Sequence, residues 1–325
     1  MTNPPPAVGS LSRGLRYLDW LYNPFRRLDV SAVYDLLSTD AATKRGLYLN
    51  LGYWRDASDL DEASEALALL VAETARMGSS DHVLDCGFGF GDQDKLWAER
   101  FTPARIVGLN VTESQVRVAR RRIAERGLAD RVDLRHGSAT EMPIEPGSVD
   151  VVLALECAFH FDPRERFFRE AWRVLRPGGR LVTADIIPTP AAKGFKERLE
   201  QRLSWGLVAS RFAIPGENAD SRPAYFSKLA LAGFGQIRIE SIRDRVYAPL
   251  HRYLGAHPET LERLHPLTGP PIRFALRFDP ESVYRGLDYV LASAVKPREP
   301  LRLVAGSARS GAAGTEARAS GPLGS

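Results

Sequence analysis

Two groups of residues in this chain have types and spacings that could do chemistry. The first is the run Val83-Leu84-Asp85-Cys86-Gly87-Phe88-Gly89-Phe90-Gly91-Asp92, in which glycines alternate with aromatic residues after an apolar stretch. Glycine there lets the backbone turn sharply and approach a ligand closely. The dinucleotide pattern G-x-G-x-x-G and the G-K-[ST] ending of a phosphate loop are absent. The run therefore suits a nucleoside ligand without phosphate, and an ordinary turn between strand and helix is the alternative.

The second group consists of Glu156, His160 and Asp185, each of which follows or ends an apolar run. Histidine is the side chain best matched to taking up a hydroxyl proton at neutral pH. A carboxylate beside it would fix its tautomer and stabilise the imidazolium, and Asp185 is the best candidate. We therefore expect His160 to act as a general base paired with Asp185, with Glu156 as a further catalytic or ligand-binding acid. The alternative is a structural histidine bonded to a backbone carbonyl.

The elements that must position these residues alternate between strand and helix. Short apolar runs predict strands at 82–86, 105–109, 132–135, 148–155, 180–187, 237–243 and 287–295. Apolar spacing and turn residues predict helices at 61–77, 92–101, 112–126, 163–175, 191–212, 222–233 and 246–265. Thr112 to Gln115 has the pattern of a capping box. Repeated strand–helix units predict an α/β, doubly wound, mostly parallel sheet, with its ligand at the carboxyl ends of the strands.

Four regions follow from this pattern. We expect an N-terminal helical lid in 1–60, a nucleoside-binding core in 61–190, and cap helices with the final strands in 191–297. The Arg, Gly, Ala and Ser composition of 298–325 predicts a disordered tail.

Composition narrows the function classes. The formal net charge of the 325 residues is only +4, and the Arg-rich stretch 117–131 falls on one amphipathic helix, so a nucleic-acid partner is not expected. The two cysteines, Cys86 and Cys157, have no metal-ligand or disulfide spacing. No signal peptide and no membrane span are apparent. We expect a cytoplasmic protein with a small-molecule partner and no metal; a homodimer or higher homo-oligomer is left open.

Six motifs in order resemble those of class I S-adenosylmethionine-dependent methyltransferases, and most of all the branch with the erythromycin-type macrolide sugar O-methyltransferases. The motifs are Tyr48 to Trp54, Val83 to Asp94, Gly137 to Thr140, Glu156 to Phe161, Arg173 to Gly179 and Ala184 to Pro188. The resemblance covers roughly 48–297 and implies a seven-stranded Rossmann-like sheet with a helical cap inserted after strand five.

The resemblance also implies where S-adenosylmethionine, and its product S-adenosylhomocysteine, would bind. The residues expected to bind it are Tyr48, Tyr53, Trp54, Asp85, Gly87, Gly89, Gly91, Asn110, Val111, Gln115, Ser138, Ala139, Thr140 and Glu156. Asp85 would support the turn, and Tyr48, Tyr53 and Trp54 would fold over the cofactor or form an aromatic core cluster. Asn110 departs from the family, where an acid binds the ribose, so that contact falls to Asn110, to Gln115 or to both.

The acceptor is less closely defined. The apolar, bulky region 191–217 is expected to cap the pocket together with 11–55 and 246–275, which suits a large hydrophobic molecule such as a glycosylated polyketide or other secondary metabolite. We expect methylation of a hydroxyl. The alternative is C-methylation of a prenyl diphosphate or other alkene, with Glu170 as base; its diphosphate could be bound by Arg211, Arg222 and Arg252. A non-catalytic cofactor-binding protein is a third hypothesis, which the intact glycines, His160 and Asp185 argue against.

Overall fold

The structure is a computed structural model that describes residues 15–20, 23, 29–37 and 42–299. The predicted disordered tail, 298–325, lies outside the described residues from position 300 onward, as does the start of the predicted lid.

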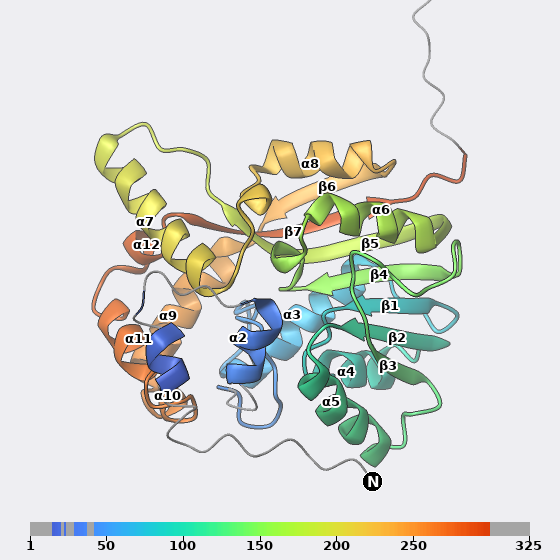
Figure 1. The fold of residues 1–325 in the computed structure, drawn as a ribbon, viewed down its shortest axis with the longest axis horizontal. Helices are drawn as coiled ribbons and strands as arrows, with labels where there is room; N and C mark the ends of the chain where they lie inside the picture. The colour runs from blue at the N-terminus through green and yellow to red at the C-terminus, as the bar shows by residue number, and fades with distance from the viewer. Residues whose placement is uncertain (1–14, 21–22, 24–28, 38–41, 300–325) are drawn as a thin grey trace, which may run out of the picture.

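A single seven-stranded sheet forms the centre of the chain (Figure 1). The strands are β1 (His82–Cys86), β2 (Arg105–Asn110), β3 (Val132–His136), β4 (Val149–Leu155), β5 (Leu175–Pro188), β6 (Gly235–Ser241) and β7 (Leu287–Val295). Their order is β3-β2-β1-β4-β5-β7-β6, with β7 antiparallel to both neighbours and the remaining pairs parallel. This confirms the predicted mostly parallel, Rossmann-like α/β sheet.

Helices cover both faces of the sheet and one end of it. They are α2 (Val30–Leu37), α3 (Leu60–Thr74), α4 (Asp92–Arg100), α5 (Glu113–Glu125), α6 (Arg164–Val174), α7 (Phe195–Arg211), α8 (Arg222–Leu231), α9 (Tyr247–Ala256), α10 (Glu259–Glu262), α11 (Gly269–Ala275) and α12 (Pro280–Val283). Apolar side chains of α3, α4 and α5 pack on one face and those of α6 and α8 on the other, which gives two buried cores. Because both faces are covered, β4 is almost wholly apolar, as its sequence predicted.

Three predicted elements differ from the structure. The helix expected at 246–265 breaks after Ala256 into α9 and α10, because Pro258 restricts the backbone of His257 to an extended conformation. The strand expected at 180–187 begins already at Leu175, which pairs with Val149 before the register shifts. Thr112 does precede α5, but its side chain makes no capping hydrogen bond, so the predicted capping box is wrong.

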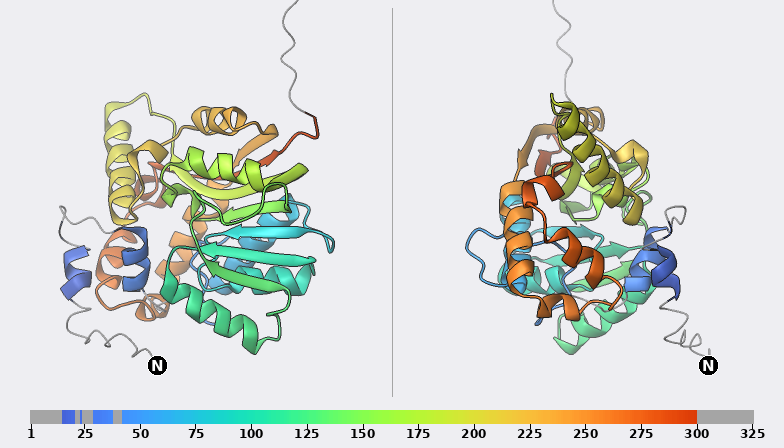
Figure 2. Two further views of the ribbon diagram at one scale, coloured as in Figure 1. Left: turned by 45° about the vertical axis from the view of Figure 1, so that its right-hand side comes forward. Right: turned by 90° about the vertical axis from the view of Figure 1, so that its left-hand side faces the viewer.

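The N-terminal segment packs against residues of the region after β5, beyond the carboxyl ends of the parallel strands. The ring of Tyr17 stacks on that of His265 with centroids 3.7 Å apart, and Trp20 Nε1 donates to the Arg211 carbonyl at 3.0 Å. Figure 2 shows the N-terminal helices beside α9 to α11 at this end of the molecule. This packing places α2 above the strand ends, where a parallel sheet binds its ligand.

The region after β5 begins with the long helix α7, which packs only one side against the rest of the molecule. α7 packs Trp205, Val208 and Ala209 toward the core, whereas Phe195, Leu199, Leu203 and Leu207 are exposed on its outer side. Among the described residues, no helix is long and apolar enough to cross a lipid bilayer.

Candidate active site

A cavity of about 500 Å³ opens at the carboxyl ends of β1, β2 and β4. We call one side the glycine end, formed by residues 87–90, 109–115 and 137–140, and the other the histidine end, formed by Tyr34, His160, Ala213 and Pro215. The predicted site residues that line the cavity are Tyr48, Gly87, Gly89, Asn110, Val111, Gln115, Ser138, Ala139, Thr140, Glu156 and His160. Tyr53, Trp54, Asp85, Gly91 and Asp185 do not.

The turn after β1 requires its glycines for specific reasons. Gly87, Gly89 and Gly91 have φ values of +85°, +57° and +79°, a region that side chains with a Cβ rarely adopt. A Cβ on Gly87 would also lie 2.6 Å from Cys157 Cβ, because the chain passes between two strand ends there. Gly91 precedes α4, whose N-terminal amide groups favour negative charge. The turn therefore offers a bare backbone and a helix terminus to a ligand.

Asp85 supports this turn from behind rather than facing the cavity. Its carboxylate is fully buried and accepts a hydrogen bond from Gln93 Nε2 at 2.9 Å, which ties the end of β1 to α4. Asp94 lies beside it, and burial together with the charge of Asp85 raises the pKa of Asp94 well above its usual value. Since Gln93 lines the cavity, Asp85 can influence a ligand only through the helix start.

Asn110 and Gln115 form one polar unit at the end of β2. Asn110 Nδ2 donates to Gln115 Oε1 at 2.9 Å and to the Gly89 carbonyl at 3.4 Å, while Asn110 Oδ1 accepts from the Thr112 amide at 3.0 Å. Both donor hydrogens of Asn110 are thus used within the protein, and its oxygen accepts one hydrogen bond there. Gln115 Nε2 is buried, has no hydrogen-bond partner, and belongs to a residue that lines the cavity. A ligand hydroxyl at this position would satisfy that amide, which a buried polar group requires.

The segment after β3 is also held by its own side chains. Ser138 Oγ accepts from the Thr140 amide at 3.1 Å and lies 2.9 Å from Thr140 Oγ1. This turn presents Ser138, Ala139 and Thr140 to the cavity beside Val111.

The three predicted lid aromatics divide into two sets. Tyr48 lines the cavity, and burial raises the pKa of its phenol. Trp54 packs with Leu60, Ala63 and Leu250, and its Nε1 donates to the Leu51 carbonyl at 3.0 Å. Tyr53 packs against the core on the same side. Trp54 thus belongs to a small apolar cluster and Tyr53 packs against the main core, so neither lines the cavity, and their place over the cofactor stays a prediction.

His160 ends a 3₁₀ turn, Ala158–His160, between β4 and α6, and its ring lies at the cavity wall. Its Nε2 lies 3.1 Å from the hydroxyl of Tyr34 on α2. Burial lowers the pKa of His160 to about 3, partly offset by the Phe212 backbone. Burial and the charge of Glu156 raise the pKa of Tyr34. Both groups are thus neutral at physiological pH, and Tyr34 can donate to His160 Nε2 in the tautomer that carries the ring proton on Nδ1.

Glu156 holds a carboxyl group between the glycine turn and the core. Its Oε1 accepts from the Leu51 amide at 2.7 Å and from the Tyr289 hydroxyl at 2.6 Å. Burial raises the pKa of Glu156 to about 7, against the effect of these two donors. With this pKa the carboxyl group is only partly ionised near neutral pH, and a cation bound beside it would lower its pKa and favour the charged form.

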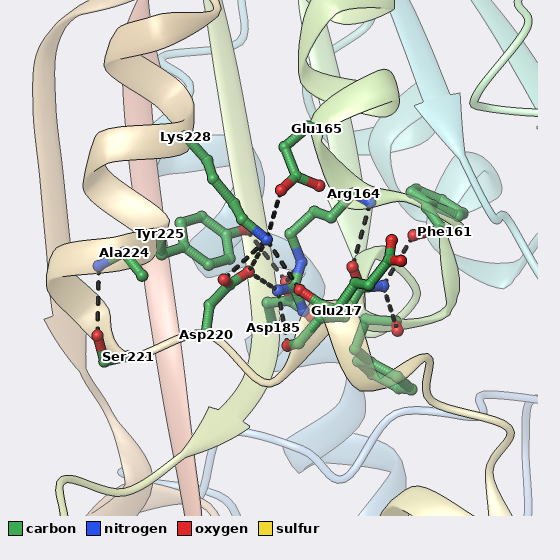
Figure 3. A network of polar contacts seen from close by, with 12 residues as sticks. Phe161, Arg164, Glu165, Asp185, Glu217, Asp220, Ser221, Ala224, Tyr225 and Lys228 are labelled. Atoms are coloured by element: carbon green, nitrogen blue, oxygen red, sulfur yellow. Dashed lines mark hydrogen bonds and ion pairs between the residues drawn. The ribbon is translucent and has the colours of Figure 1, made fainter.

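The predicted pairing of His160 with Asp185 is wrong. Asp185 is completely buried at the end of β5, where its Oδ2 lies 3.2 Å from Arg164 Nε and accepts from the Tyr225 hydroxyl at 3.1 Å. Arg164 is itself fully buried and requires negative partners, so it takes the carboxylate that the sequence assigned to His160. Figure 3 shows Arg164 between Asp185 and Asp220.

Several residues at this site had no sequence signal. Tyr34 lies in the aromatic N-terminal region, but nothing there marks which tyrosine reaches His160. Tyr289 and Asn218 belong to regions predicted as a final strand and a loop. Of the three segments expected to cap the pocket, 11–55 lines the cavity with residues 29–31, 34 and 47–50. The segment 191–217 contributes only Ala213 and Pro215, and no residue of 246–275 lines the cavity.

Comparison with known proteins agrees with this geometry. Residues 84–183 match the family model described as a methyltransferase domain. The chain is 38% identical to erythromycin 3''-O-methyltransferase of Saccharopolyspora erythraea over 278 residues, which cover 81% of this chain and 89% of that relative. The protein therefore belongs to the S-adenosylmethionine-dependent methyltransferases.

Two further likenesses have narrower scope. The chain is 36% identical to 27-O-demethylrifamycin SV methyltransferase of Amycolatopsis mediterranei over 167 residues, half of this chain and 61% of that one. A crystal structure of geranyl diphosphate C-methyltransferase from Streptomyces coelicolor superposes with a TM-score of 0.61 at 18% identity, covering 84% of this chain and 99% of that chain. At that identity the second likeness shows a common fold only.

Proposed function

We propose that this enzyme methylates a hydroxyl group on a bulky, hydrophobic secondary metabolite of the macrolide glycoside type. The observation that carries the proposal is the Tyr34–His160 pair, which lies in the same cavity as the glycine turn and can accept a hydroxyl proton. The relatives that act on erythromycin and rifamycin support this acceptor class.

The glycine end would hold the methyl donor. S-adenosylmethionine supplies a methyl group on a positively charged sulfonium and leaves as S-adenosylhomocysteine. We assign its ribose to Gln115 Nε2, its adenine to the turn of Ser138, Ala139 and Thr140 next to Val111, and its carboxylate to the backbone after Gly89. Glu156 lies beside Cys157, which contacts the turn, and would bind the ammonium group.

At the histidine end, the chain's own side chains would remove the proton. As the acceptor oxygen releases its proton to the Tyr34 oxygen, Tyr34 passes its own proton to His160 Nε2, and the imidazole becomes an imidazolium. The low pKa keeps His160 neutral beforehand and makes it a weak base. We therefore expect His160 to accelerate methyl transfer by about 100-fold, near the lower end of the usual range for base catalysis.

The alternative, C-methylation of a prenyl diphosphate, has less support. Among the described residues that line the cavity there is no Lys or Arg to bind a diphosphate. Glu170, its expected base, lies on the outer side of α6 and accepts from the Met142 amide at 2.8 Å and from Arg173 Nε at 2.7 Å. It does not line the cavity, so it stabilises a surface loop.

The test is a mass-spectrometric assay with S-adenosylmethionine and two sets of acceptors. One set contains macrolide glycosides with a free sugar hydroxyl, and the other contains geranyl diphosphate with Mg²⁺. A gain of one methyl on a glycoside oxygen, located by fragmentation, would support the proposal. A carbon-bound methyl on the diphosphate would favour the alternative, and donor binding without any transfer would contradict both.

A further inference from the structure

We infer that Asn218 is the positioning residue that fixes His160 and joins it to the loop that forms the outer wall of the cavity. This rests on the proposed function, because it assigns a residue that serves the proposed base. Asn218 does not line the cavity, and its role is visible only in its contacts.

The turn that carries His160 is short and weakly held by itself. Its backbone bonds are His160 N to the Cys157 carbonyl at 2.9 Å and Phe161 N to the Ala158 carbonyl at 3.2 Å. A single 3₁₀ turn of this kind has poorer hydrogen-bond geometry than an α-helix. The ring therefore depends on contacts from outside the turn for a fixed position.

Asn218 supplies those contacts on both sides of His160. Its Nδ2 donates to the Phe159 carbonyl at 3.0 Å and to the Phe161 carbonyl at 2.7 Å, so the residues immediately before and after His160 share one amide group. Its Oδ1 accepts from the Arg164 amide at 3.1 Å. The side chain is completely buried and both of its donor hydrogens are used, so no other residue type of this size can replace it.

Arg164 holds Asn218 in turn. One guanidinium nitrogen donates to the Asn218 carbonyl at 2.9 Å and to Asp220 Oδ2 at 2.6 Å, and Nε lies 3.2 Å from Asp185 Oδ2. Lys228 also reaches Asp220, as Figure 3 shows. The charge of Arg164 is thereby balanced by two carboxylates, which allows a buried arginine to fix the backbone of an uncharged neighbour.

The same loop reaches the cavity. Ala213 and Pro215 line it a few residues before Asn218, in the same cavity as His160. One end of the loop thus forms the acceptor wall, while Asn218 at its other end holds the base. An acceptor that moves this wall would also move His160, so Asn218 couples acceptor seating to the position of the proton acceptor.

The test compares Asn218→Ala and Asn218→Asp with a control in the same loop, Ser221→Ala. Ser221 caps α8 by accepting from the Ala224 amide at 3.3 Å. Asn218→Asp keeps the volume but puts an acceptor oxygen against two carbonyls. We expect both Asn218 variants to lower kcat on a macrolide glycoside about 10- to 100-fold, since small misplacement of a reacting group has effects of this size. Affinity for S-adenosylmethionine should change less than threefold, and Ser221→Ala should keep kcat.

A second readout does not need the acceptor. Diethyl pyrocarbonate modifies neutral imidazoles, and His160 is only 7% exposed in the folded chain. We expect the modification rate of His160, followed by peptide mass spectrometry, to rise at least tenfold in the Asn218 variants and to stay constant in Ser221→Ala. The partly exposed His257 provides an internal reference.

The outcomes separate the two proposals. Faster modification without turnover of any glycoside would support the positioning role and contradict the proposed function. Glycoside turnover with unchanged kcat and unchanged His160 modification in both Asn218 variants would overturn the positioning role alone. If both variants fail to bind S-adenosylmethionine, Asp220→Asn carries the test, because it loosens Arg164 while the Asn218 amide remains; unchanged modification of His160 there would also overturn the inference.

Discussion

The glycine end of the cavity is made from short runs of neighbouring residues, whereas the histidine end joins segments that are far apart in the chain. Asn110 and Gln115 meet within one strand–helix turn, and Ser138 and Thr140 within another. Tyr34 and His160 are 126 positions apart. Local backbone geometry therefore determines the first end, and the packing of separate segments determines the second. Substitutions at the glycine end should impair donor binding, and those at the histidine end should impair turnover.

The largest effect should come from the glycine turn. Gly89→Val places a β-branched side chain at φ +57° beside the donor cavity, and we expect affinity for S-adenosylmethionine to fall more than about 100-fold. Gly147→Val is the matched control, because Gly147 has φ +61° and nothing within 4 Å of the added Cβ. Calorimetric titration of both variants measures the effect. Equal losses would mean that backbone strain alone, and not the site, is responsible.

At the histidine end, His160→Ala should reduce kcat about 100-fold while donor affinity changes less than threefold. Tyr34→Phe should show a similar loss if Tyr34 relays the proton. His257→Ala serves as control, since this histidine is partly exposed, lies outside the cavity and pairs with Glu259. Steady-state kinetics with the glycoside acceptor gives kcat for each variant. A full-activity Tyr34→Phe enzyme would show that the acceptor donates to His160 directly.

A substitution at Asp185 tests the His160–Asp185 pair expected from the sequence against the Arg164–Asp185 ion pair of the structure. Asp185→Asn removes one of two carboxylates from the buried Arg164 and should lower the free energy of unfolding by about 3 kcal/mol or less, because Asp220 remains. We expect kcat to fall less than tenfold. Urea unfolding and kinetics together decide the matter: a kcat loss equal to that of His160→Ala would restore Asp185 as the partner of the base.

The protonation of Glu156 should make the free energy of unfolding depend on pH. Its pKa rises from 4.5 in the unfolded chain to about 7 in the folded one, so its stabilising contribution is complete below pH 4.5 and is lost as the pH rises through 7. Relative to Glu156→Gln, the wild type should therefore lose about 2–3 kcal/mol of unfolding free energy between pH 5 and pH 8. Urea titrations at the two pH values test this. The same variant should bind S-adenosylmethionine more weakly, and a parallel pH dependence in both proteins would contradict the assignment.

The smallest effect belongs to Glu170. Its ion pair with Arg173 is partly exposed, so Glu170→Gln should cost about 1 kcal/mol of stability or less and leave kcat unchanged. Thermal unfolding and the glycoside assay are sufficient. A large loss of turnover would revive the C-methylation hypothesis.

The sequence predicted which residues form the glycine end because local backbone conformation determines their positions. The positive φ angles of the turn require glycine, and the strand ends follow from apolar runs. Gln115 was harder to interpret, because the same residue suits a capping box and a partner for Asn110, and only the tertiary structure shows the second.

The histidine end was predicted only in part. The sequence shows that Glu156, His160 and Asp185 come to one edge of a parallel sheet, but it does not show which groups lie between them. Arg164 starts the helix after His160 and competes for Asp185, and a buried guanidinium outweighs a neutral imidazole as a partner. Tyr34 and Asn218 reach the site from segments whose docking depends on the whole fold, so no local pattern identifies them.

The position of β7 has a consequence for how the enzyme is made. β6 precedes β7 in the chain but lies outside it in the sheet, so β6 has no strand to pair with until residues 287–295 have been synthesised. Tyr289, which holds Glu156, arrives with the same strand. A nascent chain that ends before this point leaves the edge of β5 unpaired and lacks the donor to its buried acid. Translation must therefore complete the last described strand before the product can work as an enzyme.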